Sequence, residues 1–316
     1  SMGTMDSNFL NGIQKNLNLP LVFNPADGSF DKDVASNSPY IAEYFREVWA
    51  HSDDIATYDD LHKLSNNIWE WSKRTPHNIG RDWDMGIKQT LSETSECTNS
   101  PLPNAACHIN LPGALYLDAS IMATGAHHNW LVDGDEFITN SDYPNWLTMG
   151  TTPDFIQAEY DYQNFGVANE KMLRDNVTDS EDAAPILTGA SSSVTASAGN
   201  VWTLQRHRSG FDILHLVNFT NLNNSQMKDV QDQNGTQPAA SMIENIGVKM
   251  YRTGTGNIGN LYMASPDYNH GKPAVLNYTT GSDASGNFIT FTAPSLKYWD
   301  MIWLENDVSN SDYAVN

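Results

Sequence analysis

Apolar residues recur along the first part of this chain with the spacing of alternating strands and helices. Leu21 to Phe23 and Ile41 to Trp49 are short apolar runs, which are typical of strands in a buried sheet. Phe9 to Leu19 and Tyr58 to Trp71 carry apolar residues at helical spacing, and Pro20 ends the first of these helices. Because strands that alternate with helices usually pair in parallel, the pattern predicts an α/β fold, as in part of a (β/α) barrel.

This pattern continues less evenly over the following residues. Leu115 to Thr124 predicts a helix, His127 to Val132 a strand and Phe155 to Leu173 a long helix. Arg74 to Ala106 is polar and has no clear period, so we expect a loop excursion there, with a short strand that the pattern does not place. Residues 1–178 are therefore assigned to a partial (β/α) barrel.

The pattern changes after Asn176. Residues 179–200 are acidic and then rich in Ala and Ser, which indicates a linker or an edge segment. Short strands and turns follow, with a clear hairpin turn at Gly281 to Gly286. This spacing predicts an all-β antiparallel sandwich over residues 201–307 and a tail over 308–316. Its expected strands are Val201–Leu204, Phe211–Val217, Val248–Tyr251, Leu261–Ala264, Phe288–Phe291 and Trp299–Leu304, and its expected core is Phe211, Ile213, Leu216, Ile289, Phe291 and Ile302.

Charge narrows the class of partner. The chain has 316 residues and a net charge of −21, with only 17 Lys and Arg. Such a surface repels phosphate, which argues against a nucleic-acid partner. No run of about 18 apolar residues is present, so no membrane-spanning helix is expected. A neutral substrate such as a polysaccharide fits this charge. Phosphate-binding glycine loops and nucleophile-elbow motifs are absent from the sequence, and no cofactor is expected.

The two cysteines, Cys97 and Cys107, lie in one polar stretch. A local disulfide and two free thiols are both compatible with this spacing. The spacing of known metal-binding motifs is absent, and two cysteines alone do not make a zinc site, so we predict no metal.

One acid, Glu47, stands inside an apolar strand between Phe45 and Trp49. If its carboxyl lies against Trp49 and away from water, desolvation raises its pKa, as a general acid for glycoside cleavage requires. The alternative is a structural acid at the end of a strand, paired with Arg46 or with a neighbouring amide. The residues alone leave both interpretations open.

A candidate sugar cleft surrounds this acid. In a (β/α) barrel the chemistry lies at the C-terminal ends of the strands, where Asn24 and Glu47 both fall. Adjacent strand residues point to opposite faces, so at most one of His127 and His128 enters a site. The chain has nine Trp and thirteen Tyr, and aromatic rings stack on sugars. The candidate substrate-binding residues are Asn24, Trp49, His127, Trp130 and Tyr143.

Several strings of this sequence resemble a known family of enzymes. Val22-Phe-Asn-Pro25, Arg46-Glu-Val-Trp49 and the segment Leu117 to Gly125 resemble the second half of the TIM-type catalytic barrel of bacterial dextranases and cycloisomaltooligosaccharide glucanotransferases (glycoside hydrolase family 66). Asp232 to Pro238 and Pro294 to Ile302 resemble the C-terminal β-domain of that family. The resemblance covers most of the chain. It is specific, because the matching strings keep their order and spacing.

The resemblance implies that Glu47 is the general acid/base of a retaining cleavage of α-1,6-linked glucan. A retaining site also needs a nucleophilic carboxylate about 5–5.5 Å away. The family has an aspartate on an earlier strand for this role, and it is not found in this chain. We therefore expect it upstream or in a companion chain that carries the first half of the barrel. The partner implied is dextran or isomaltooligosaccharides, and the location implied is secreted or on the surface of a bacterium.

Three functions are open under this resemblance. The absence of a large insert in the barrel portion favours an endo-dextranase-type hydrolase. The competing class is a non-catalytic, glucan-binding or structural remnant, and the third is a transglycosylating enzyme that forms cycloisomaltooligosaccharides. Arg46 stands where the family usually has Thr, and the residues after His127 also depart from the family pattern. These departures affect subsites more than fold.

Overall fold

The structure is a computed structural model that describes residues 2–17, 20–24, 31–37, 41–48, 55–72, 76–81, 86–88, 107–130, 132–133, 136–137, 151–226, 237–252 and 256–306. The chain divides into two compact units. The first unit comprises Ser1–Phe155 and Gln226–Thr236, and the second comprises Ile156–Ser225 and Gln237–Asn316.

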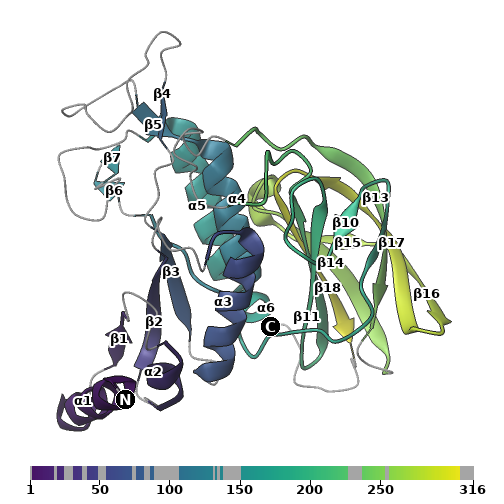
Figure 1. Ribbon diagram of the computed structural model, residues 1–316. Coiled ribbons are helices and arrows are strands. Elements are labelled where there is room, and N and C mark those ends of the chain that lie inside the picture. Colours follow the sequence, from purple (N-terminus) through teal and green to yellow (C-terminus); the bar gives the residue numbers. More distant parts are fainter. Residues whose placement is uncertain are drawn as a thin grey trace. The chain divides into compact units, whose positions relative to one another are not determined.

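The first unit contains the parallel sheet that the sequence predicts. Its strands are ordered β1-β2-β3, and both pairs of neighbours are parallel. They lie side by side in Figure 1, with helices between them in sequence. The parallel pairing of the predicted strands, now β1 and β2, is therefore confirmed, whereas a closed or half barrel is not directly visible. The elements are α1 (Met2–Leu17), β1 (Leu21–Phe23), α2 (Asp31–Asn37), β2 (Ile41–Val48), α3 (Tyr58–Trp71) and β3 (His77–Arg81).

Helix α3 shows why this order forms. Thr57 caps its N-terminus through a capping box, in which its hydroxyl accepts from the Asp60 amide and the Asp60 carboxylate accepts from the Thr57 amide. The apolar side of the helix is buried, and Ser65 hydrogen-bonds His77 of β3 at 2.9 Å. The indole of Trp69 donates to the Thr124 carbonyl oxygen at 3.0 Å. The helix therefore covers one face of the sheet.

The remainder of the first unit corrects two predictions. The polar stretch predicted as a loop excursion holds β3 and β4 (Gly86–Lys88), and β4 pairs antiparallel with β5 (Cys107–Ile109). A continuous strand was predicted from His127 to Val132. In the structure, only His127 makes strand-like hydrogen bonds to β3, and Val132 belongs to a separate hairpin of β6 (Val132–Asp133) and β7 (Glu136–Phe137). Between these lies α4 (Leu111–Ala123), which Asn110 caps by accepting from the Gly113 amide at 2.7 Å.

The second unit is an antiparallel sandwich with a helix on its outer side. The larger sheet has the order β10-β11-β12-β18-β14-β15, with β8 beside β11, and the smaller sheet has the order β16-β17-β13-β9. The pairs are antiparallel except β10 with β11. The elements are α5 (Pro153–Ala168), α6 (Glu170–Leu173), β8 (Thr178–Asp179), β9 (Ile186–Thr188), β10 (Ser192–Ser193), β11 (Val201–Arg208), β12 (Phe211–Asn218), β13 (Ile243–Tyr251), β14 (Ile258–Ala264), a 3₁₀ turn (Asn269–Gly271), β15 (Ala274–Leu276), β16 (Tyr278–Asp283), β17 (Gly286–Leu296) and β18 (Trp299–Asn306).

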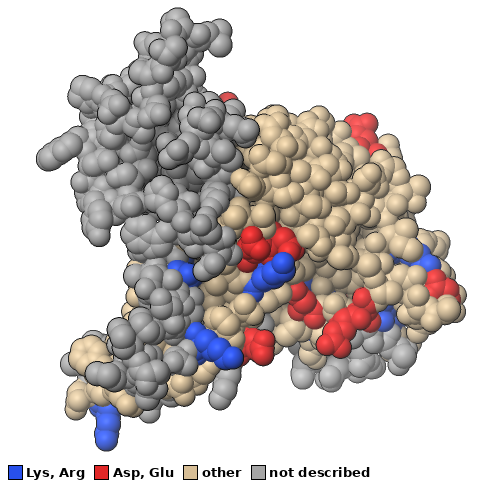
Figure 2. All heavy atoms as spheres, in the orientation of Figure 1, with Lys and Arg blue, Asp and Glu red and all other residues tan. Residues whose placement is uncertain are grey.

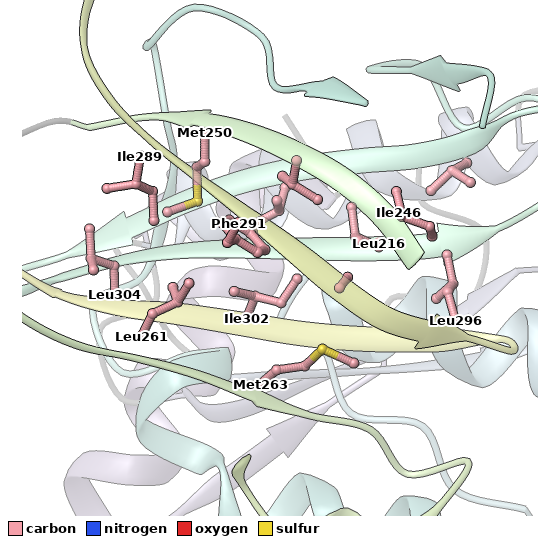
Figure 3. Close-up of a cluster of buried hydrophobic side chains, with 14 residues drawn as sticks. Leu216, Ile246, Met250, Leu261, Met263, Ile289, Phe291, Leu296, Ile302 and Leu304 are labelled. Carbon is pink, nitrogen blue, oxygen red and sulfur yellow. The ribbon is translucent and has the colours of Figure 1, made fainter. Parts of the chain in front are cut away.

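One hydrophobic core lies between the two sheets (Figure 3). Leu216 and Ile302 of the larger sheet meet Ile289 and Phe291 of the smaller one, as the sequence predicts. The prediction was wrong for two residues. Ile213 is buried, but it alternates with Leu214 and Leu216 and so faces the other side of β12. Phe211 is only partly buried and lies under the Arg208 guanidinium.

The outer face of the larger sheet is covered by α5. The ring of Phe165 packs edge-on against Trp299 at 5.0 Å, and the Tyr162 hydroxyl donates to Asp267 at 2.8 Å. This packing places α5 from Ile156 onward in the second unit, although the sequence assigned residues up to 178 to the barrel. The expected linker at 179–200 holds the edge strands β9 and β10.

Charge is unevenly spread over the surface. On the face drawn in Figure 2, the acidic side chains form small groups with a few basic neighbours, and broad areas carry neither sign. Within the part of the chain that the structure describes, no helix is long and apolar enough to cross a membrane.

Candidate active site

The two faces of the parallel sheet have different surroundings. Tyr44 pairs with His77 and Arg46 pairs with Ile79, and all four residues are buried. The contact of His77 with α3 identifies this as the face that the helix covers. Successive residues of a strand point to opposite faces, so Glu43 and Phe45, which are only partly buried, belong to the other face, called here the open face.

A row of residues crosses this open face. Phe45 pairs with Asn78 of β3. The two residues that flank Asn78 both bond to His127. The His127 amide donates to the His77 carbonyl oxygen (2.8 Å), and the Ile79 amide donates to the His127 carbonyl oxygen (2.9 Å). This is the pattern of a parallel bridge, so His127 continues the row beyond β3. On the other side, Asn24 follows Phe23, whose partner is Tyr44, and register extends the row to Asn24.

Position 47 lies next to this row, two residues further toward the C-terminal end of β2. Its partner on β3 is Gly80, which has no side chain. The residue before it, Arg46, is buried on the α3 face. The side chain of Glu47 itself lies outside the described residues, as do Trp49 and Tyr143.

The other candidate side chains are not brought to this row. His128 is buried on the α4 side, where its Nδ1 lies 2.5 Å from Oδ1 of the fully buried Asp118. The indole of Trp130 donates to both Asp118 oxygens at 3.3 Å, and its ring packs edge-on against His128 and Phe155. His128 and Trp130 are thus both held against α4 by Asp118.

Asp118 is the residue that sequence reasoning missed. It is an acid inside the apolar helix α4, and it accepts hydrogen bonds from two side chains of the segment that follows His127. The signal was available, because a lone acid in an apolar helix must be paired when it is buried. Its contacts fix the chain next to His127 and so help to position the row.

The row can bind a polar substrate and offers one carboxyl group near its end. Amide and imidazole groups hydrogen-bond sugar hydroxyls, and a carboxyl at position 47 can exchange a proton with a glycosidic oxygen. Glu43 is on the same strand and the same face, but four residues away, which is about 13 Å along a strand. That is too far for a retaining pair of carboxylates. Among the described residues, no three His, Cys, Asp or Glu side chains converge as metal ligands would.

The described residues thus form a parallel sheet with helices, followed along the chain by an antiparallel β-sandwich. Residues 4–303 match the family model of glycosyl hydrolase family 66, and the chain therefore belongs to that family.

The relatives of this chain are named for two activities. Two cycloisomaltooligosaccharide glucanotransferases of Niallia circulans are 32% identical over 208 residues and 33% identical over 199 residues, covering 63% and 61% of this chain. A dextranase of Streptococcus salivarius is 24% identical over 216 residues, which is 62% of this chain. The matches cover 21%, 19% and 26% of these relatives, so the chain corresponds to only part of their length.

A crystal structure of a cycloisomaltooligosaccharide glucanotransferase from Paenibacillus sp., complexed with cycloisomaltoheptaose, has the same fold. It superposes with a TM-score of 0.77 at 18% identity, over 94% of this chain and 58% of that one.

Proposed function

We propose that this chain carries the acid/base side of a retaining site that cleaves α-1,6-linked glucan, of the endo-dextranase type. The observation that carries the proposal is the place of position 47, at the C-terminal end of β2 and beside the row that ends at His127. Family membership supports it, and so do the activities named for the relatives. In this proposal the β1-β2-β3 sheet is part of the second half of a TIM-type barrel.

In the proposed mechanism Glu47 begins protonated. It gives its proton to the glycosidic oxygen while a nucleophilic carboxylate attacks the anomeric carbon and forms a glycosyl–enzyme bond. Glu47 then takes a proton from water, and that water releases the sugar. Asn24 and His127 hydrogen-bond sugar hydroxyls next to the cleaved bond. The nucleophile comes from sequence outside this chain, in the same protein or in a companion chain.

Transglycosylation is the second candidate, and the named activity of the glucanotransferase relatives favours it. The two reactions share the glycosyl–enzyme intermediate and differ only in whether water or a sugar hydroxyl resolves it. A secreted or cell-surface bacterial location follows from either, because dextran is too large to enter a cell. A non-catalytic glucan-binding protein is the alternative if no nucleophile joins the site.

The test compares dextran cleavage by three proteins. The 316-residue chain alone should release reducing sugar at a negligible rate, because acid catalysis alone contributes only about 10²–10⁴-fold. The chain complemented with the upstream half of the barrel should be active, and Glu47→Gln should abolish that activity. Glu43→Gln is the matched control, because it changes the same residue type on the same face of β2 and should keep most of the activity.

Two results would contradict the proposal. Undiminished release by the complemented Glu47→Gln variant would remove the acid/base assignment. Strong release by the chain alone would mean that it holds its own nucleophile, and Asp27, Asp82 and Asp84, which lie outside the described residues, would be tested first.

A further inference from the structure

The smaller sheet of the sandwich carries a groove on its outer side. Along β13 and β17, Ile246, Val248, Ile289 and Phe291 point into the core, so the residues between them point outward. A groove of about 830 Å³ lies over this outer face, lined by β9, β13, β17 and the connection from β15 to β16. It belongs wholly to the second unit and is separate from the row at His127.

The floor of the groove is backbone flanked by hydroxyl groups. Gly247 pairs with Thr188 on one side and Thr292 on the other. A side chain at position 247 would fill the space between them, since its Cβ would stand 3.3 Å from the Thr188 Cβ. In the next row the Thr279 and Thr290 hydroxyls are hydrogen-bonded at 2.6 Å. Threonine hydroxyls therefore line both sides of a shallow, open floor.

The ends of the groove combine amide and aliphatic groups. Asn245 has a left-handed backbone (φ 56°), which is uncommon in a strand and is often retained at ligand sites. Asn277 contributes a second amide to the lining. Ile186 and Val275 also line the groove, and they are 51% and 63% exposed, far more than is usual for aliphatic side chains in a sheet.

The lining carries no uncompensated charge. Lys249 is the one charged residue among the residues that line the groove, all of which the structure describes. Its ammonium is paired with Asp283 and lies over the Phe288 ring at 4.0 Å. The Tyr251 hydroxyl also donates to Asp283, at 3.0 Å. A charged ligand would find no partner here, whereas a neutral chain rich in hydroxyl groups would meet hydroxyl and amide groups along its edges and aliphatic groups against its C–H faces.

We propose that this groove is a second, non-catalytic binding site for a neutral glucan chain, which holds the polymer on the protein while the site at position 47 acts on it. The choice of an α-1,6-glucan as the ligand rests on the proposed function. A tethered polymer is presented repeatedly to the catalytic site at a raised effective concentration. The groove should therefore affect cleavage of long dextran and leave cleavage of short oligosaccharides almost unchanged.

The test is a titration of the full ¹⁵N-labelled chain with isomaltoheptaose, followed by NMR. We expect the amide signals of Gly247, Lys249 and Thr292 to shift. The double variant Thr188→Ala/Thr292→Ala should bind about tenfold more weakly, because it loses two hydroxyl partners. Thr195→Ala is the matched control, since Thr195 is exposed in the same unit but lies outside the groove, and it should bind as the unchanged protein does.

A second pair of variants tests the groove without touching its floor. Val275→Asp places an unpaired charge on the rim and should also weaken binding, whereas Val194→Asp, at an equally exposed valine outside the groove, should not. The proposal is overturned if isomaltoheptaose leaves the groove signals unshifted, if both groove variants bind normally, or if polyethylene glycol shifts the same signals equally. Equal shifts with maltoheptaose would overturn the choice of an α-1,6-linked glucan as the ligand. None of these results depends on Glu47, so they are distinguishable from a failure of the catalytic proposal.

Discussion

At the residue scale, buried ionisable side chains hold the second unit together. Arg206 is fully buried, and its guanidinium donates to Asp179 at 3.1 Å, to the Leu173 carbonyl oxygen at 3.0 Å and to the Val177 carbonyl oxygen at 3.3 Å. Burial lowers the pKa of Arg206, and Asp179 opposes that shift. A buried cation is tolerable only with partners of this kind, so Arg206 fixes the segment around α6 and β8 onto β11.

His215 makes the second unit sensitive to acid. Burial, and then the charge of Arg206, lowers the pKa of His215 to about 3. Its Nδ1 accepts a hydrogen bond from the Trp299 indole at 3.2 Å, which requires that nitrogen to be unprotonated. Because the folded-state pKa lies below the unfolded value, the stabilisation is present above about pH 6.5 and is lost as pH falls toward 3.

We predict that His215→Asn flattens this response. The unchanged protein should lose about 2–3 kcal/mol through His215 between pH 7 and pH 4.5. Asparagine offers an oxygen to the Trp299 indole but does not titrate. Urea unfolding of both proteins across this pH range measures the difference in slope. Burial raises the pKa of Asp267 and Asp300, so these two residues favour the folded state as pH falls. Both proteins contain them, so they do not affect the comparison. Parallel stability curves would contradict the prediction.

At the element scale, the sequence predicted those helices and strands whose own residues show a cap or a regular apolar pattern. Helix α3 was predicted at its observed bounds because it has a capped start and a regular apolar side. Strand β3 was expected somewhere in residues 74–106 but could not be placed, because His77, Asn78 and Arg81 are polar. Its stability comes from pairing with β2 and from the contact of His77 with α3. Helix α2 was missed for a similar reason, since it is short and largely polar. Tertiary contacts of this kind leave no period in the sequence.

The candidate site was predictable to the same extent. Asn24 and Glu47 could be placed at strand ends because each directly follows or ends an apolar run. The opposite directions expected of His127 and His128 rest on strand alternation and stay a prediction. The place of Trp130 could not be predicted, because it depends on a hydrogen bond to Asp118, which lies 12 residues earlier in α4. The functional roles of all these residues stay predictions.

The cap of α3 gives a test at this scale. We expect Thr57→Ala to lower the free energy of unfolding of the first unit by about 1 kcal/mol, because it removes the hydroxyl that accepts from the Asp60 amide. Thr57→Ser keeps that hydroxyl and should cost much less. Thermal unfolding followed by circular dichroism compares the two variants. An equal loss in both would mean that the cap contributes little.

At the scale of the whole molecule, the boundary between the units falls in the first turn of α5, after Phe155, rather than after the helix. The larger sheet has two buried faces, one on the sandwich core and one beneath α5, where Phe165 meets Trp299. A sequence pattern distinguishes helix from strand, but it does not say which neighbouring element a helix packs against. Helix α5 and the segment with β8, β9 and β10 are therefore structural parts of the sandwich unit rather than a linker.

This boundary predicts different behaviour for two fragments of the chain. A fragment of residues 151–307 keeps α5, α6 and the edge strands, and its amides in β12 and β18 should exchange slowly with deuterium. A fragment of residues 200–307 lacks every partner of the Arg206 guanidinium named above and uncovers Trp299. Leaving a buried charge without its partners costs about 3–5 kcal/mol, which is a large share of the stability of a small domain. Hydrogen exchange in β12 and β18 should therefore be at least a hundredfold faster in the shorter fragment.

Arg206→Met in the longer fragment is the matched control for this comparison. It removes the charge instead of its partners, and replacing a buried ion pair by an apolar side chain of similar size is often close to neutral. The same substitution in the shorter fragment should recover part of the lost protection, because no unpaired charge then remains in the sheet. Equal exchange in the two unsubstituted fragments would show that residues 201–307 form a complete domain without α5, and that the contacts of Arg206 add little to its stability.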